Sequence, residues 1–292
     1  MPTFQTRTVF WLFRVTGLFK KQFKGGPTFK RYIDASRSST STPSPKLARN
    51  LDISLSHFQG RDVWTVAPRD RRASATVLYW HGGGYVYPAA SLHWSFFAHM
   101  AKVYGWRVVA PLYPLAPEHN AQEISNFALD FYRNLLKSHD GTPLAMAGDS
   151  AGGGLTATTL MRARDEGCVL PDRVILICPW LDIAATDPDQ VTIEERDPIL
   201  SIRGLREAGL MFAKGTGIDH PMASPLMGDW RGLPPILAFG GGDDILVTDS
   251  RSLKTKLPEL RYEEAEDMIH VWPIFGLPEG RIAQRTMAEF IT

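Results

Sequence analysis

Short apolar runs that end at Gly or Pro alternate with helix-length amphipathic segments from about residue 50 to the end of the chain. A buried parallel strand reads as a continuous apolar run, and it needs a helical crossover to reach the next strand. The alternation therefore predicts an α/β fold with a mostly parallel central sheet flanked by helices on both faces. The predicted strands are 63–67, 75–80, 107–111, 144–147, 173–178, 236–239 and 261–264. The predicted helices are 91–104, 121–138, 151–166, 248–257 and 279–290.

Two segments depart from this pattern. Residues 180–231 are long, irregular and rich in Pro, Asp and Met, which predicts an insertion that lies over the carboxyl edge of the sheet. Residues 34–45 are rich in Ser, Thr and Pro, and they predict a linker because they have little to bury. We therefore expect an N-terminal arm at 1–45 and one α/β domain at 46–292.

The N-terminal arm is basic, whereas the whole chain is balanced. The chain has 32 Lys and Arg against 31 Asp and Glu, and its formal charge of +1 gives no overall field for a nucleic-acid partner. In the arm, Trp11, Val15, Leu18 and Phe19 recur at helical spacing, which predicts a basic amphipathic helix. Residues 1–33 contain no Asp or Glu, and their basic residues are Arg7, Arg14, Lys20, Lys21, Lys24, Lys30 and Arg31.

Three interpretations of this arm helix stay open: a first helix that packs on the body, an interfacial membrane anchor, and a mitochondrial presequence. No apolar stretch approaches the roughly 18 residues that a membrane span needs. The two cysteines, Cys168 and Cys178, lie in or beside apolar runs, which favours buried, reduced thiols. We expect a cytoplasmic protein, with a membrane surface or the mitochondrion as alternatives.

The segment Gly148-Asp-Ser-Ala-Gly152 follows a short apolar run and precedes a helix-forming stretch. This is the G-x-S-x-G pattern in the strand–turn–helix context that a nucleophile elbow requires. Glycine is needed at both ends because the strained turn brings the neighbouring backbone too close for a side chain. Ser150 is therefore the predicted nucleophile. A phosphate loop is the alternative, but no Gly-Lys-Ser/Thr follows the glycines.

Three consecutive glycines follow His81, directly after the strand predicted at 75–80. In this architecture the loop supplies backbone N–H groups to an oxyanion, and the residue after the nucleophile supplies another. We expect the oxyanion-hole donors to be Gly83, Gly84 and Ala151. His81 is predicted to fix the loop by hydrogen bonding rather than to transfer protons.

The base and its partner acid must follow Ser150 in the order acid, then His. Of the two later histidines, His220 precedes the acids near residue 243 and breaks this order, whereas His270 follows the last predicted strand. His270 is therefore the predicted base. Asp243 and Asp244 both end the run that begins at 236, and spacing does not separate them.

Together these motifs resemble the hormone-sensitive lipase family of α/β-hydrolases, the serine esterases with HGGG and GDSAG motifs. The resemblance runs from about residue 73 to 276, and it implies a cap built from the N-terminal arm plus an insertion at about 180–225, after the sixth strand. It also selects Asp244 over Asp243, because Asp244 heads the family's D-x-L pattern. The matching motifs are His81–Gly84, Tyr113–Glu118, Gly148–Gly153, Cys178–Asp182, Asp197–Leu200, Ser224–Leu226, Gly232–Pro235, Asp244–Leu246 and Ile269–His270.

The resemblance implies a serine hydrolase that cleaves carboxylic esters of short to medium acyl chains through Ser150, Asp244 and His270. Its partner would be a small-molecule ester, with no metal or organic cofactor, and homodimers are common among relatives. Aromatic residues beside the motifs, of which we name Tyr85, Trp180 and Trp272, are predicted to line the substrate pocket. The alternatives are a pathway-specific thioesterase, lactonase or arylformamidase on the same residues, and a non-catalytic ligand-binding receptor on the same scaffold.

Overall fold

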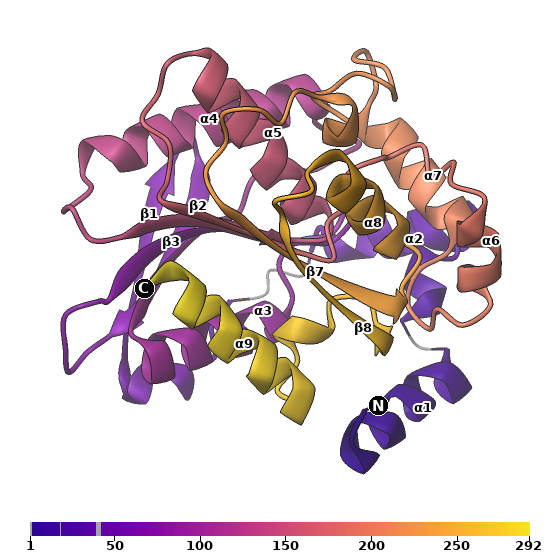
Figure 1. Cartoon of the computed structure of the whole chain (residues 1–292), viewed down its shortest axis with the longest axis horizontal. Helices are drawn as coiled ribbons and strands as arrows, with labels where there is room; N and C mark the ends of the chain where they lie inside the picture. The colour runs from indigo at the N-terminus through magenta and orange to yellow at the C-terminus, as the bar shows by residue number, and fades with distance from the viewer. Residues whose placement is uncertain (1, 18, 39–41) are drawn as a thin grey trace.

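The computed structural model describes residues 2–17, 19–38 and 42–292. Within these residues, eight strands form one sheet in the order β1-β2-β4-β3-β5-β6-β7-β8, and the six strands from β3 to β8 are parallel (Figure 1). Only β1 and β2 run antiparallel to their neighbours. The predicted α/β fold is therefore confirmed. The strands are β1 (Leu51–Phe58), β2 (Arg61–Pro68), β3 (Ala75–Trp80), β4 (Trp106–Pro111), β5 (Leu144–Asp149), β6 (Arg173–Ile177), β7 (Ile236–Asp243) and β8 (Arg261–Ile269).

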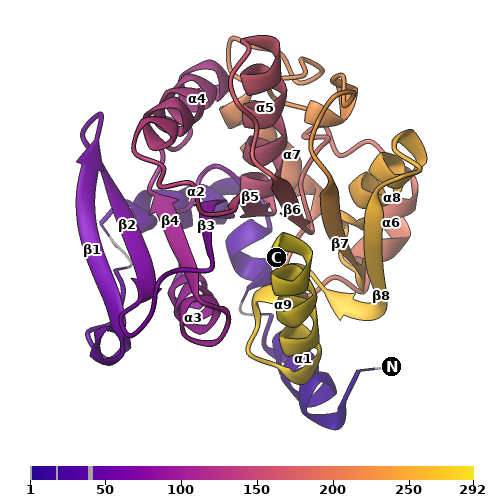
Figure 2. The same cartoon turned by 60° about the vertical axis from the view of Figure 1, so that its left-hand side comes forward.

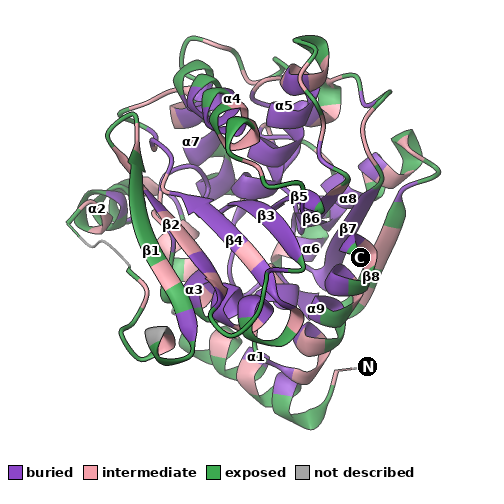
Figure 3. Ribbon diagram, turned by 90° about the vertical axis from the view of Figure 1, so that its left-hand side faces the viewer, coloured by how far each residue is buried: buried purple, intermediate pink, exposed green. Residues whose placement is uncertain are grey.

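Helices cover both faces of this sheet (Figure 2). One face carries α4 (Ala121–Lys137), α5 (Ala151–Asp165) and α8 (Val247–Lys256), and the other carries α3 (Ser91–His99) and α9 (Pro278–Ile291). Every residue of β3, β5 and β7 is buried, as the central strands in Figure 3 show. Short helical turns complete this framework: η2 (Leu47–Arg49), η3 (Met100–Tyr104) and η5 (Trp272–Ile274).

The N-terminal arm differs from the sequence prediction. Its first helix, α1 (Phe4–Thr16), ends at Gly17, whose φ of 55° and N–H bond to Phe13 O close the helix. Phe19 therefore lies beyond the helix, and Leu18 lies outside the described residues. The linker predicted at 34–45 is also wrong at its start, because α2 (Gly26–Ser36) continues into it as far as Ser36; residues 39–41 of that linker are outside the description.

The arm packs on the body and on the insertion. The Phe10 and Phe13 rings lie against Phe275, at centroid distances of 6.4 and 5.9 Å. Between α1 and α2, the turn η1 (Lys20–Phe23) accepts a hydrogen bond at Phe23 O from Ser201 Oγ (2.6 Å). Figure 1 shows α2 beside the insertion helix α7 (Ile202–Phe212), which in turn packs against the other insertion helix, α6 (Asp189–Glu194).

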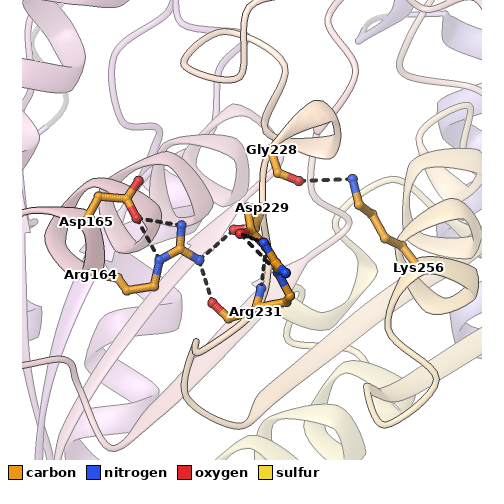
Figure 4. Close-up of polar contacts among 6 residues, drawn as sticks. All are labelled: Arg164, Asp165, Gly228, Asp229, Arg231 and Lys256. Carbon is orange, nitrogen blue, oxygen red and sulfur yellow. Dashed lines mark hydrogen bonds and ion pairs between the residues drawn. The ribbon is translucent and has the colours of Figure 1, made fainter.

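The end of the insertion is fixed before the chain enters β7. After the turn η4 (Pro225–Met227), Arg164 of α5 donates to the carbonyls of Asp229 and Arg231, at 2.7 and 2.5 Å. Lys256 of α8 donates to Gly228 O at 3.0 Å (Figure 4). These cations close the insertion onto two helices of the same sheet face. In the part of the chain that the structure covers, no helix combines the length and apolar character that crossing a membrane requires.

Candidate active site

The three predicted catalytic side chains come from one edge of the sheet. Ser150 follows the last residue of β5, Asp244 follows β7, and His270 follows β8. Because β5 to β8 are parallel, their carboxyl ends face the same side. All three residues are buried, with Ser150 6% and His270 4% exposed, so the site is covered in this structure.

Ser150 occupies a strained turn between β5 and α5. Its φ of 54° and ψ of −124° lie where a residue with a side chain is rarely found, and its N–H donates to Ile177 O of β6 (2.9 Å). The glycines make this turn sterically possible. A Cβ at Gly148 would overlap the Gly152 carbonyl, and a Cβ at Gly152 would overlap Trp80 O and lie 2.7 Å from His81 O.

We expect Gly152→Ala to destabilise the fold by about 3 kcal/mol or more, because the atoms it would meet are backbone carbonyls that cannot turn away. Urea unfolding measures this free energy. Gly276→Ala is the matched control, since its Cβ would meet only the end of the flexible Arg281 side chain, 3.1 Å away. Equal stability of the two variants would show that the elbow is not sterically limited by Trp80.

The glycine loop after β3 presents free backbone amides. Gly83 has φ of 118° and Gly84 has φ of 62°, both in the region that favours glycine. Among the described residues, no hydrogen bond engages the N–H of Gly83, Gly84 or Ala151. These are the three amides that the sequence predicts as oxyanion donors, and each remains able to donate a hydrogen bond to a ligand.

A buried carboxylate, Asp149, holds this loop in place through hydrogen bonds. Its Oδ1 accepts hydrogen bonds from Gly82 N–H (3.0 Å) and Tyr79 OH (2.8 Å), and His93 Nε2 lies 3.2 Å away. Ala90 N–H donates to His93 Nδ1, so the proton of this imidazole points at Asp149. Burial opposes ionisation, but the His93 and Tyr79 contacts outweigh it and lower the pKa of Asp149.

Sequence reasoning missed the role of His93 and Asp149 in placing this loop. Asp149 lies inside the GDSAG motif, which was the available signal, whereas nothing in the sequence marks His93. His81 lies as predicted for a structural residue. Its Nδ1 is 2.7 Å from Gly82 O, its ring stacks on Tyr113, and burial lowers its pKa to about 4.

His270 and Asp244 form a direct pair, with 2.8 Å between Nδ1 and Oδ2. The second oxygen of Asp244 accepts from Leu246 N–H (2.9 Å), which fixes the carboxylate. Burial alone would lower the pKa of His270, but the charge and hydrogen bond of Asp244 outweigh burial and raise it. The imidazole is therefore oriented, and its protonated form is stabilised.

Asp243, the other acid that spacing leaves open, faces elsewhere. It pairs with Arg14 of α1 and with Arg196 of the insertion, whose Nε lies 2.9 Å from Oδ1. Adjacent carboxylates thus have different partners: Asp244 binds the histidine, and Asp243 joins the arm and the insertion to the end of β7.

Two further buried groups surround the pair. Asp197 of the insertion accepts from Ile245 N–H (3.0 Å), beside Asp244, and burial and the Asp244 charge raise its pKa to about 7. The ligand atoms of Cys178, Asp244 and His270 lie within 4.8 Å of one another, which is close enough for a metal ion. Two of these groups, however, already bond to each other.

The three aromatic residues predicted for the substrate pocket are all buried near the site. The Tyr85 ring stacks on Phe212 of α7 at 3.6 Å. Trp180 donates to Asp182 O and Trp272 to Gly240 O, both at 3.0 Å. The indole nitrogens of Trp180 and Trp272 are thus satisfied by backbone carbonyls, and Tyr85 joins the glycine loop to the insertion.

Comparison with known proteins identifies the family. Residues 77–274 match a family model described as an alpha/beta hydrolase fold. The chain is similar to an acetyl-hydrolase of Streptomyces hygroscopicus (35% identity over 231 residues, 76% of each chain) and to an esterase of Acinetobacter venetianus (30% over 237 residues, 76% of each).

A solved structure of an esterase from the bacterial hormone-sensitive lipase family superposes with a TM-score of 0.83. It shares 28% identity, and the match covers 100% of this chain and 98% of the other. The resemblance read from the sequence motifs is thereby confirmed. The chain belongs to the hormone-sensitive-lipase-like α/β-hydrolases and is a carboxylic ester hydrolase.

Proposed function

We propose that Ser150, His270 and Asp244 form the catalytic triad, with Gly83, Gly84 and Ala151 as the oxyanion hole. The observation that carries this proposal is the 2.8 Å bond between His270 Nδ1 and Asp244, on the sheet edge that also holds the elbow serine. Because Nδ1–H donates to the Asp244 carboxylate, the neutral imidazole keeps its proton on Nδ1, and Nε2 is unprotonated and can act as a base. The free amides of the glycine loop support the second half of the proposal.

In the proposed reaction, Ser150 Oγ attacks the ester carbonyl while its proton moves to His270 Nε2. The oxyanion accepts hydrogen bonds from the N–H groups of Gly83, Gly84 and Ala151. The tetrahedral intermediate then collapses as His270 gives the proton to the leaving alcohol. Water then attacks the acyl-enzyme while His270 takes its proton. His270 returns that proton to Ser150 Oγ as the acid leaves. Apart from the ester and the water, every group that this chemistry uses is a side chain or backbone amide of this chain.

We propose that the arm, residues 1–45, and the insertion at about 180–225 form a cap over the domain of residues 46–292. Two observations support it: Ser150 and His270 are buried, and Asp243 pairs with Arg14 of the arm and Arg196 of the insertion. Substrate entry would then require movement of one of these segments.

The proposed substrates are small esters with short to medium acyl chains, bound against Tyr85, Trp180 and Trp272. The similarity to a protein named acetyl-hydrolase supports a short acyl group. The test is hydrolysis of p-nitrophenyl esters from acetate to palmitate, with Ser150→Ala as the control for background. We expect the highest kcat/KM at or below octanoate.

If kcat/KM were highest for palmitate, the proposed preference for short to medium acyl chains would be wrong, but the esterase activity would stand. If folded protein hydrolysed none of the p-nitrophenyl esters, thioesters, lactones or arylformamides would be favoured as substrates. A non-catalytic receptor is disfavoured because His270 is present and bonded to Asp244.

We also propose a homodimer paired along β8, the edge strand of the sheet. Its exposed carboxylates Glu266 and Asp267 would repel a second copy, so the dimer should strengthen as salt increases. Sedimentation equilibrium at low and high salt tests this. The proposed compartment is the cytoplasm, which the free thiols of Cys168 and Cys178 support.

A further inference from the structure

The helix α1 has apolar side chains on two opposite faces. One face packs on the protein, where Thr6 and Phe10 are buried. The opposite face carries Phe4 and Trp11, 80% and 58% exposed, and Val15, 63% exposed, at spacings of seven and four residues. We call Phe4, Trp11 and Val15 the outer stripe of α1. Folded proteins rarely leave a clustered apolar face of this kind without a partner.

The surroundings of the outer stripe are basic. A shallow hollow of about 340 Å³ lies between Phe4, Arg7, Thr8 and Trp11, which places a guanidinium beside the stripe. In the turn after α1, Lys20, Lys21 and Lys24 line a second hollow together with Arg203 and the single carboxylate Glu194. Figure 1 shows α1 at the periphery of the molecule, next to the N-terminus.

Most cations of the arm have no anionic partner within the protein. Arg14 pairs with Asp243, Arg37 pairs with Glu118, and Lys20 donates to the carbonyls of Glu194 and Asp197. The others make no side-chain hydrogen bond or ion pair with any described residue, and they are all exposed: Arg7, Lys21, Lys24, Lys30 and Arg31. An apolar stripe combined with unpaired cations matches a bilayer with anionic head groups, whose interface accepts aromatic side chains and whose phosphates attract Lys and Arg.

We propose that the outer stripe of α1 docks the protein on an anionic lipid bilayer. Phe4, Trp11 and Val15 enter the boundary between head groups and acyl chains, and Arg7, Lys21 and Lys24 face the phosphates. Carboxylates also lie near α1, since Glu195, Glu266 and Asp267 line a hollow with Arg14. The attraction therefore depends on Arg7 of α1 and on Lys21 and Lys24 of the turn after it, not on the charge of this whole end of the molecule.

The test uses the full chain in co-sedimentation with vesicles of phosphatidylcholine alone and of phosphatidylcholine with about one third phosphatidylglycerol. We expect the partition coefficient to be at least about tenfold higher for the anionic vesicles and to fall as salt is raised. Trp11→Ser/Val15→Ser should reduce binding to the anionic vesicles at least about tenfold. Lys21→Gln/Lys24→Gln should remove much of the salt dependence.

Val169→Ser/Ile282→Ser is the matched control, because these side chains are 74% and 56% exposed on other elements. It should bind as the wild type does, and thermal melting should show that all variants are folded. Equal binding to both vesicles, no binding, or full binding by Trp11→Ser/Val15→Ser would each overturn the proposal. Light scattering that finds a dimer dissociated by that double substitution would assign the outer stripe to a second copy instead.

Discussion

Ser150→Ala is expected to lower kcat roughly 10³-fold or more on the best p-nitrophenyl ester, because it removes the oxygen that we propose forms the acyl-enzyme. The oxyanion amides remain, so a small residual rate above water is expected. Folding should be little affected: in the described part of the chain the Ser150 hydroxyl has no hydrogen-bond partner to lose. The measurement is kcat, with thermal melting beside it.

Ser250→Ala is the control for this variant. Ser250 is also buried, and its Oγ has no hydrogen-bond partner among the described residues, yet it lies on α8 and outside the proposed site. It should keep kcat within about threefold of the wild type. A serine-directed organophosphonate should label the wild type and Ser250→Ala but not Ser150→Ala. Substantial turnover by Ser150→Ala would assign the nucleophile to another residue.

The central strands could be predicted from the sequence because both faces of each strand are buried. The strand β3 (Ala75–Trp80) has the predicted bounds, since all of its residues are buried and most of them are apolar. The strand β1 was missed for the opposite reason. Most of its side chains face solvent, and it is held by antiparallel pairing with β2 through the turn at Gln59 and Gly60, whose φ values are 47° and 74°.

The helix α7 was not predicted from the sequence because it contains two glycines. Gly204 and Gly209 lower helix propensity and make residues 202–212 read as irregular. The structure explains both: a Cβ at Gly204 would overlap Phe23 O of the arm, and one at Gly209 would lie 2.7 Å from Ile183 O. The glycines let α7 approach other backbone segments, and such long-range contacts leave no local pattern in the sequence.

Some residues of the proposed site could be predicted from short motifs, whereas the contacts that hold them in place could not. Ser150 and the glycine loop are short motifs whose local backbone dictates their composition, so sequence could identify them. The choice between Asp243 and Asp244 depended on resemblance, because adjacent residues on a strand end differ only in what they face. Here the contacts differ: Asp244 bonds to His270, and Asp243 to Arg14 and Arg196.

Asp244→Asn should lower kcat by about 10³- to 10⁴-fold, because the amide neither fixes the His270 tautomer nor stabilises the imidazolium. The pH profile should change as well. The base must be neutral, so kcat/KM rises through the pKa of His270, which Asp244 holds above its ordinary value in the wild type. Without that charge, burial dominates and lowers the pKa, and the rising limb of the profile moves to lower pH.

Asp243→Asn is the adjacent control. It weakens the ion pairs with Arg14 and Arg196, whose side chains are 43% and 52% exposed, so the loss of stability should be at most about 1 kcal/mol. We expect kcat within about threefold of the wild type and an unshifted pH profile, because His270 keeps its bond to Asp244. If Asp243→Asn lost as much kcat as Asp244→Asn, the acid would not be assigned by its hydrogen bond to the histidine. A shared loss would instead show that catalysis depends on the contacts that hold the arm and the insertion at the end of β7.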